Sequence, residues 1–342
     1  MKYIGLDAHS KRCFFAVLDG KGKVLTTQYV ATNETELVQF VQSIKGHKAL
    51  VFEEGVLSQW LYILLKKEVD KLVVCQPVER KKGAKTDKID AIEMANLLRI
   101  NRLKSVFHVD NELFNIRTLI SGYDDIIRSL VQAKNRYKAL YRQVAVDTSN
   151  GKIYTDQQMI ELLPTEPQRI IARLLFEQIA MLEQQRVALV DNFKSNARRY
   201  KPVRLMMSIP GIGEVRANQI VGIMVTPHRF PNKYKLFSYA MLTKHERISD
   251  NKFYGRKRPK GQATLKNIFL NCAVSSLQSK NAFRRRYDEK RTSGSKDCTA
   301  RVTVAQKYAA TVLGVWKSGK DYDDNYTEER QTKTRVNNNS NG

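Results

Sequence analysis

Four acidic side chains, Asp7, Glu53, Asp87 and Asp90, lie where short apolar segments end or where a helix is expected to begin. Asp7 closes the segment YIGLD and Glu53 follows the apolar run 49–52, so both are expected at the ends of buried strands. In KTDKIDA, Asp87 and Asp90 are three residues apart and would share one face of a helix. Carboxylates that come close repel one another, and a divalent cation removes that repulsion. The spacing therefore predicts a site at which carboxylates converge.

Converging carboxylates suit phosphodiester transfer. That reaction develops charge on the attacking and leaving oxygens, and two Mg²⁺ ions about 3.5 to 4 Å apart stabilise both. Oxygen ligands suit Mg²⁺, whereas the 4 cysteines form no CxxC pair and the 5 histidines form no HExxH or HxH pattern. Each carboxylate also has an ordinary interpretation: Asp7 as a turn cap at a strand end, and the DxxD pair as a solvated helix face.

An α/β domain must position these side chains. Short strand patterns at 3–7, 13–19 and 23–30 predict a three-strand meander, followed by a helix at 35–44. The apolar run 49–52, a helix at about 57–67, a strand at 71–76 and a helix at 87–100 follow. Strands in series followed by alternating strand and helix predict an α/β domain over residues 1–107.

Mainly helical segments are expected in the rest of the chain. Apolar residues at helical spacing predict long helices at about 110–142 and 167–199. Together they are expected to form a helical hairpin or short coiled coil over 108–200, with oligomerisation as a by-product. A carboxy-terminal domain over 201–317 includes SIPGIGEVRANQI, which resembles a helix-hairpin-helix. Residues 318–342 lack apolar periodicity and are expected to be a disordered tail.

The charge points to a polyanionic partner. Lys and Arg total 59 against 34 Asp and Glu, giving a net charge of +25. Nucleic acid is the leading candidate, with a basic but unrelated enzyme as the alternative. No apolar run approaches the roughly 20 residues that a spanning helix needs, so no membrane role is expected. The scattered cysteines fit a reducing cytoplasm.

Basic and glycine residues suited to nucleic-acid contact occur in several places. A further cluster, 284–291, contains three consecutive arginines, although any such cluster is usually a solvated face. The candidates for contact with phosphates or bases lie in the loop before Asp87, in the turn of SIPGIG and in the segment after Ser249: Arg80, Lys81, Lys82, Lys85, Gly211, Gly213, Lys252, Tyr254, Arg256, Lys257, Arg258 and Lys260.

The segments GLDAHS, FEEG and KTDKIDA resemble the three signatures of the DEDD insertion-sequence transposases, the bridge-RNA-guided recombinases, a group that includes the Piv-type DNA invertases. The resemblance implies an RNase H-like, RuvC-type fold for the amino-terminal domain. It also implies that Asp7, Glu53, Asp87 and Asp90 are catalytic and bind Mg²⁺. The second position departs from the commoner pattern, since Glu53 and Glu54 directly precede Gly55; Glu53 is favoured and Glu54 stays open.

The resemblance continues in the carboxy-terminal half, through FSYAMLTKHERISDNKFYGRKRPKGQATLKNIFL. It implies that Ser249 is a catalytic nucleophile, although Asp250 stands where the family commonly has Gly. It further implies that DNA and a structured noncoding RNA are partners, and that the protein acts as a homodimer or homotetramer. Residence in the cytoplasm, at the nucleoid, is expected.

Three alternatives stay open. A RuvC-like structure-selective nuclease would use water in place of Ser249, and a DNA invertase of the same family would join strands with a different outcome. A non-catalytic nucleic-acid-binding module would use the carboxylates only as surface charge.

Overall fold

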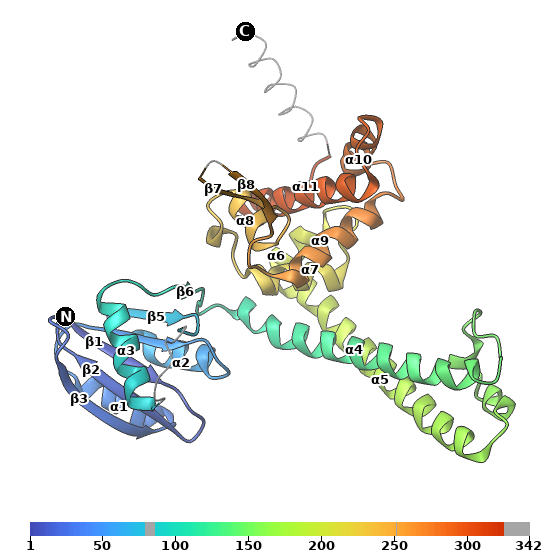
Figure 1. Cartoon of the computed structure of the whole chain (residues 1–342). Helices are drawn as coiled ribbons and strands as arrows, with labels where there is room; N and C mark the ends of the chain where they lie inside the picture. The colour runs from blue at the N-terminus through green and yellow to red at the C-terminus, as the bar shows by residue number, and fades with distance from the viewer. Residues whose placement is uncertain (79–85, 251, 325–342) are drawn as a thin grey trace, which may run out of the picture. The chain divides into compact units, whose positions relative to one another are not determined.

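The computed structural model describes residues 1–78, 86–250 and 252–324, and the chain divides into two compact units, residues 1–111 and 112–342 (Figure 1). The loop residues Arg80, Lys81, Lys82 and Lys85 lie outside the described residues. None of the helices in the described ranges combines the length and apolar character needed to span a membrane.

A mixed sheet organises the first unit. Its strands are β1 (Lys2–Asp7), β2 (Arg12–Leu18), β3 (Val24–Ala31), β4 (Lys48–Glu53), β5 (Lys71–Cys75) and β6 (Ser105–Val106). Their order is β3-β2-β1-β4-β5-β6. The first three strands form the predicted antiparallel meander, β1 pairs in parallel with β4, and β4 pairs in parallel with β5. The carboxyl ends of β1, β4 and β5 therefore meet at one edge of the sheet.

Helices cover both faces of this sheet. On one face, α1 (Glu34–Ser43) and α2 (Ser58–Leu65) pack on alternate residues of the strands, among them Ile4, Leu6 and Phe52. On the other face lies α3 (Asp87–Arg99), whose Ala91 and Met94 belong to the side of the helix that packs on β2 and β4. The α/β architecture expected for the amino-terminal part is confirmed.

Gly5 sets the distance between α3 and the central strand. A methyl group at Gly5 would overlap the carbonyl oxygen of Ala91 and lie 2.9 Å from the amide nitrogen of Ala95. Only glycine fits here, because the atoms it would meet are backbone atoms that cannot rotate away. The middle of α3 is thereby held against β1.

We expect Gly5→Ala to destabilise the first unit by about 3 kcal/mol or more, since neither the strand nor the helix backbone can give way without losing packing. Gly20→Ala is the control, because its added methyl group would meet only the Met1 carbonyl oxygen, at 3.9 Å. Chemical denaturation checks the prediction. Equal midpoints for the two variants would contradict it.

Two long antiparallel helices open the second unit. α4 (Ile116–Arg142) and α5 (Glu166–Arg199) lie side by side (Figure 1) and enclose a core that includes Tyr137, Ala172 and Ile179. α5 begins at a capping box, in which the Thr165 side chain accepts from the Gln168 amide while Gln168 reaches back to the Thr165 amide. Both helices lie close to the ranges that periodicity predicts.

A helical body with one small hairpin completes this unit. Its elements are α6 (Lys201–Met207), α7 (Glu214–Met224), α8 (Lys233–Tyr239), β7 (His245–Ser249), β8 (Lys252–Lys257), α9 (Ala263–Ser276), α10 (Ala282–Thr292) and α11 (Asp297–Ser318). Short 3₁₀ helices occur in this unit at Glu112–Phe114, Lys152–Tyr154, Gln157–Leu162 and Pro227–Arg229, and in the first unit at Lys66–Glu68. The buried residues of α11, including Val304, Tyr308 and Val312, form the centre of the body.

The chain after α11 is held against the body up to Asp324. Tyr322 stacks on Phe283, and the Asp324 carboxylate accepts from the Ala282 amide and from Arg285, both at 2.9 Å. Composition predicts a disordered tail from residue 318, but 319–324 are packed, because Asp324 caps the amino terminus of α10. Residues 325–342 lie outside the described part of the chain.

Candidate metal centre and candidate nucleic-acid interface

Asp7 and Glu53 end neighbouring parallel strands on the same face of the sheet. In β1, Gly5 faces α3, so Asp7, two residues on, projects to that face as well. In β4, Ala49 and Val51 pack with α3, which places Glu53 on the same side. The structure thus puts both carboxylates at the edge toward which α3 begins.

α3 supplies the other two carboxylates. Thr86 caps the helix by accepting a hydrogen bond from the Ile89 amide at 3.3 Å. Asp87 and Asp90 occupy its first turn, where the partial positive charge of the helix terminus favours negative side chains. Asp90 is 3% exposed, whereas the Asp87 side chain is 37% exposed.

These neighbouring carboxylates affect the pKa of Asp7. Burial raises its pKa, the nearby Asp87 and Asp90 raise it further, and His9 opposes the increase. A cation placed here would reverse the balance, since it stabilises the ionised form of every carboxylate around it. The electrostatics are those of a centre that favours a cation.

Two residues that sequence reasoning missed contact the carboxylates. His9 Nε2 lies 3.3 Å from Asp7 Oδ2 and 3.8 Å from Asp87 Oδ1. The Tyr29 hydroxyl donates to Asp87 Oδ2 at 3.1 Å. Among the described residues, the group whose ligand atoms all lie within 4.8 Å of one another is Asp7, His9 and Asp87, with Glu53 and Asp90 outside it. The sequence signal that could have identified His9 is its place two residues after Asp7, directly after the first strand.

Glu53 and Glu54 have separate surroundings. Glu53 Oε1 accepts from the Val78 amide at 3.0 Å, and the Glu53 charge adds to burial in raising the pKa of Cys75 to about 12. Glu54 instead contacts His108 Nε2 at 2.6 Å. His108 packs on Tyr62 of α2, on the face of the sheet opposite α3. The Glu54 carboxylate is therefore tied to the side away from Asp7.

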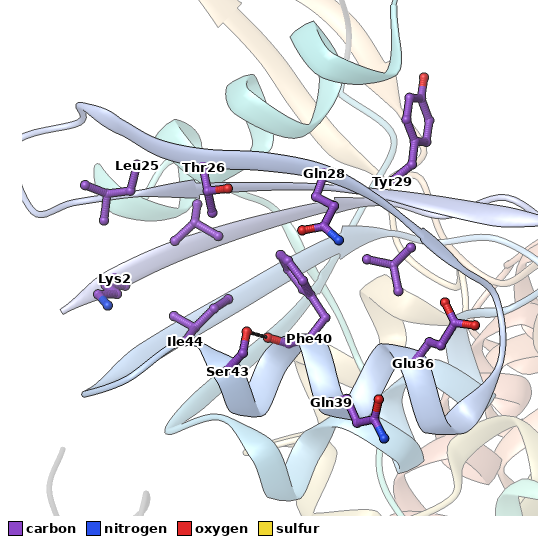
Figure 2. Close-up of a pocket in the computed structure, with 12 residues that line it drawn as sticks. Lys2, Leu25, Thr26, Gln28, Tyr29, Glu36, Gln39, Phe40, Ser43 and Ile44 are labelled. Carbon is purple, nitrogen blue, oxygen red and sulfur yellow. Dashed lines mark hydrogen bonds between the residues drawn. The ribbon is translucent and has the colours of Figure 1, made fainter.

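A cavity of about 560 Å³ lies between β3 and α1, on the side away from α3 (Figure 2). Phe40 and Ile44 of α1 and Gln28 of β3 are among the residues that line it, while the Tyr29 hydroxyl points away from it (Figure 2). Asp7, Glu53, Asp87 and Asp90 are not among the residues that line it. They lie where β1 and β4 end and α3 begins.

Ser249 ends β7, at the turn of the β7-β8 hairpin in the second unit. It pairs with Lys252 across the turn and is exposed. Asp250, the next residue, has φ +50°, in the left-handed region that glycine adopts freely and aspartate tolerates. The residue by which this chain departs from the commoner Ser-Gly pattern therefore has the backbone conformation that glycine would favour.

The strand β8 and the residues that follow it include half of the predicted nucleic-acid contacts. Phe253 and Tyr254 are 59% and 60% exposed, large fractions for aromatic rings. The basic side chains on and after this strand are also exposed: Lys252, Arg256, Lys257, Arg258 and Lys260. Arg256 is partly neutralised, because its guanidinium contacts Glu246 at 2.9 Å. The hairpin presents cations and aromatic rings together.

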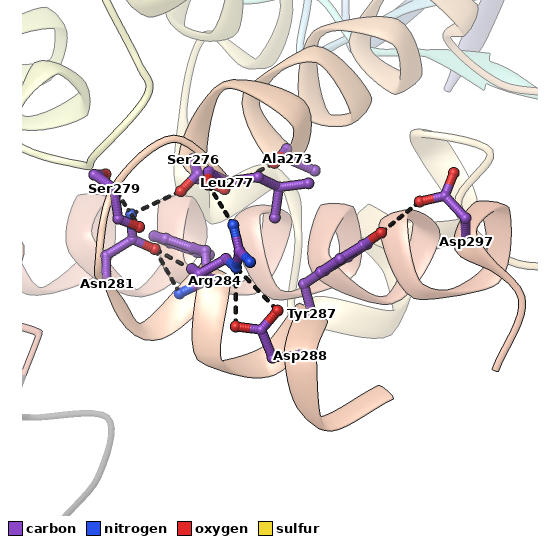
Figure 3. A network of polar contacts seen from close by, with 10 residues as sticks. Ala273, Ser276, Leu277, Ser279, Asn281, Arg284, Tyr287, Asp288 and Asp297 are labelled. Atoms are coloured by element: carbon purple, nitrogen blue, oxygen red, sulfur yellow. Dashed lines mark hydrogen bonds and ion pairs between the residues drawn. The ribbon is translucent and has the colours of Figure 1, made fainter. Parts of the chain in front are cut away.

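The arginines of α10 are engaged within the unit. Arg284 contacts Asp288 at 2.9 Å and donates to the Leu277 carbonyl oxygen at 2.7 Å (Figure 3). Arg285 pairs with Asp324, and Arg286 pairs with Glu289. The prediction that this cluster adds to the nucleic-acid surface is weakened for these three side chains, because each charge is already compensated.

The turn between α6 and α7 contains Gly211 and Gly213. Gly211 has φ +80°, and a methyl group there would lie 3.0 Å from the Tyr308 hydroxyl. Gly213 is exposed and caps α7. Glu214 places a negative charge in the first turn of α7, which opposes phosphate binding there. Packing explains Gly211, while Gly213 stays available to a ligand.

Two family models match the two parts of the chain that contain the candidate residues. A family model of the DEDD, IS110 type, described as "Transposase", matches residues 4–145, which include Asp7, Glu53, Asp87 and Asp90. A second, described as "Transposase IS116/IS110/IS902 family", matches residues 203–288, which include Ser249.

A relative from Streptomyces coelicolor is described as "Insertion element IS110 uncharacterized 43.6 kDa protein". It is 22% identical over 169 residues, which cover 49% of this chain and 42% of the relative, so the match spans less than half of that protein's length. With the two family matches, this similarity shows that the chain belongs to the DEDD, IS110-type family of transposases.

Proposed function

We propose that this protein is a transposase that cuts and rejoins DNA strands, using Mg²⁺ held by carboxylates of the first unit and Ser249 of the second as nucleophile. The observation that carries the proposal is the meeting of the Asp7 and Asp87 carboxylates at the edge where parallel strands end, with Asp90 close enough to affect the pKa of Asp7. Family membership supplies the reaction class.

The first unit supports an RNase H-like, RuvC-type fold. An antiparallel meander joined to parallel strands in the order β3-β2-β1-β4-β5, with helices on both faces, is the arrangement we expect for that fold. The acidic residues then occupy the positions that the resemblance assigns to them.

The donor set fits Mg²⁺. Asp7, Asp87, Asp90 and Glu53 offer oxygen atoms, and the Cys75 thiol beside Glu53 is buried with its pKa raised to about 12, so a thiolate does not compete. Two bound ions would polarise the scissile phosphate and stabilise the leaving oxygen. Glu53 is held by the Val78 amide and Asp87 by the Tyr29 hydroxyl, so both carboxylates are oriented before any ligand arrives.

Glu53, rather than Glu54, is the proposed second acidic ligand, because the Glu54 carboxylate is turned toward His108. We expect Glu53→Gln to lower strand exchange at least about a hundredfold, as loss of an oriented ligand does. Glu54→Gln, the matched control one residue away, should stay within about threefold of wild type. Initial rates of plasmid recombination measure both, and the reverse order would reassign the ligand.

Ser249 is the proposed nucleophile, and its exposed place at a hairpin turn supports this role because a DNA backbone could approach it. Its hydroxyl oxygen would attack phosphorus and expel a DNA 3′ or 5′ oxygen, leaving a protein–DNA phosphodiester that a second DNA hydroxyl later reverses. Lys252, which pairs with Ser249 across the turn, would hold the phosphate.

The carboxylates belong to the first compact unit and Ser249 to the second. That both act in one active site is implied by the family resemblance. If the two halves come from different subunits, a homodimer or homotetramer is required. The exposed aromatic rings of β8 and the net charge of +25 support DNA and a structured noncoding RNA as partners. The proposed helix-hairpin-helix contact to a phosphate would be made at Gly213, at the surface of the α6-α7 turn, against the opposing charge of Glu214.

A plasmid assay tests the proposal. The protein is expressed with the noncoding DNA that flanks its reading frame, and products are separated before and after protease digestion. A transposase gives joined strands and a protein–DNA adduct that protease removes. Cut ends without an adduct would instead favour the RuvC-like nuclease, inverted segments would favour the invertase, and unchanged plasmid would favour a binding module.

A further inference from the structure

His9 places a ring nitrogen between two carboxylates of the proposed metal centre. Its Nε2 is 3.3 Å from Asp7 Oδ2 and 3.8 Å from Asp87 Oδ1. The nitrogen is hydrogen-bonded to Asp7 Oδ2 and lies too far from Asp87 Oδ1 for a hydrogen bond. The same atom, with its lone pair free, faces the point toward which both oxygens are directed.

The backbone at His9 is anchored, so its position is not that of a free surface side chain. The His9 carbonyl oxygen accepts from the Thr32 hydroxyl at 2.7 Å, and the buried Cys13 sulfur lies 3.9 Å from it. The ring itself is 56% exposed. Packing therefore does not explain why an imidazole stands here, whereas contact with the carboxylates does.

The Asp87 carboxylate is oriented so that one of its oxygens could bind the same cation as His9. The Tyr29 hydroxyl occupies Asp87 Oδ2, while Oδ1 faces the imidazole. Tyr29 is held in turn by the edge of Phe14, with ring centroids 4.7 Å apart, and by the Arg12 guanidinium, 4.3 Å from the Tyr29 ring centroid. This second layer fixes one oxygen of Asp87 and leaves the other for a cation.

We propose that His9 Nε2 is a direct ligand of a cation bound by Asp7 and Asp87, so that the centre accepts Mg²⁺ but binds Mn²⁺ more tightly. The inference rests on the proposed function, because it concerns the same metal centre. Mg²⁺ binds oxygen ligands almost exclusively, whereas affinity for nitrogen-containing sites rises from Mn²⁺ along the transition series. A mixed set of two carboxylates and one imidazole therefore gains more with Mn²⁺ than with Mg²⁺.

Metal binding by the intact chain without DNA tests the inference. Mn²⁺ alone is titrated and followed by electron paramagnetic resonance, and Mg²⁺ is titrated by competition. We expect His9→Ala to weaken Mn²⁺ binding about tenfold and Mg²⁺ binding less than threefold. Bound Mn²⁺ should show ¹⁴N hyperfine coupling in the wild type and lose it in His9→Ala.

His47→Ala is the matched control, because His47 also contacts a carboxylate, Asp70 at 3.0 Å, elsewhere in the same unit. It should change neither affinity nor coupling. Equal Mn²⁺ affinity and coupling in wild type and His9→Ala would overturn the inference. Mn²⁺ binding that Asp7→Asn abolishes but that shows no nitrogen coupling would overturn the role of His9 and leave the carboxylate centre standing. Absence of Mn²⁺ binding to the wild type would overturn both.

Discussion

Replacing Asp7 by asparagine should lower the rate of DNA strand cleavage about a thousandfold or more, which corresponds to roughly 4 kcal/mol of lost transition-state stabilisation. The amide matches the carboxylate in size but carries no charge, so it cannot balance a divalent cation. Asp7 has neighbours on three elements, since β1 holds it, His9 follows it and α3 brings Asp87 toward it. No single neighbour could replace its charge.

Stability should change in the opposite direction from activity. Because the pKa of Asp7 is raised in the folded protein, its ionised form is less favourable there than in the unfolded chain. That free-energy penalty is absent at a pH below the pKa of Asp7 in the unfolded chain and is complete at a pH above its pKa in the folded protein. It therefore applies at neutral pH. Asp7→Asn removes it, and the Tm at pH 7 should equal or exceed that of wild type.

Asp70→Asn provides the control for this pair of measurements. Asp70 lies at the amino-terminal end of β5, where its carboxylate accepts from the Lys48 amide at 2.7 Å and its pKa is lowered, with the His47 hydrogen bond as the main cause. Asp70→Asn should keep the full rate of DNA cleavage. Its Tm should fall slightly below that of wild type at any pH above the ordinary pKa of an aspartate. An inactive Asp7→Asn with a Tm several degrees below wild type would point to misfolding, and an active one would refute the metal role of Asp7.

The sequence predicted the succession of strands β1 to β5 along the chain and the start of α3, because these depend on local patterns. Strand alternation and the Thr86 cap act within a few residues of where they are read. Gly5 differs, because it packs against Ala91 of the distant helix α3. The carboxylates at strand ends could also be expected to gather from the local patterns. Parallel strands bring their carboxyl ends to one edge whatever the loops between them do.

Other features of the site depend on contacts between distant segments. Glu53 and Glu54 could not be separated by sequence, since the distinction rests on His108, which is 54 residues from Glu54 and holds only one of them. Tyr29 reaches Asp87 across 58 residues. The three arginines of α10 resemble a nucleic-acid surface in sequence, yet Asp324, 39 residues from Arg285, already compensates one of them. Such pairings arise from tertiary packing, which composition cannot reveal.

Replacing Ser249 by alanine should abolish the covalent protein–DNA adduct and reduce strand joining about a thousandfold or more, because no hydroxyl oxygen remains to form the bond to phosphorus. The hairpin should stay folded, since Ser249 is exposed and its part in the β7-β8 register is made by the backbone. Binding of DNA by the cations of β8 should therefore persist, so the variant loses chemistry and keeps affinity. A gel assay for the adduct and a filter assay for binding separate these two effects.

Two neighbouring substitutions complete the experiment. Ser238→Ala removes another hydroxyl of the same unit, one that lies 3.4 Å from His245 Nε2, and should leave adduct formation unchanged. Asp250→Gly should also stay active, because the backbone there already has φ +50° and glycine adopts that conformation without strain. If Ser249→Ala kept strand exchange while Asp7→Asn lost it, water would be the attacking group and the protein would act as a nuclease. The shape of the hairpin would then serve to hold DNA rather than to attack it.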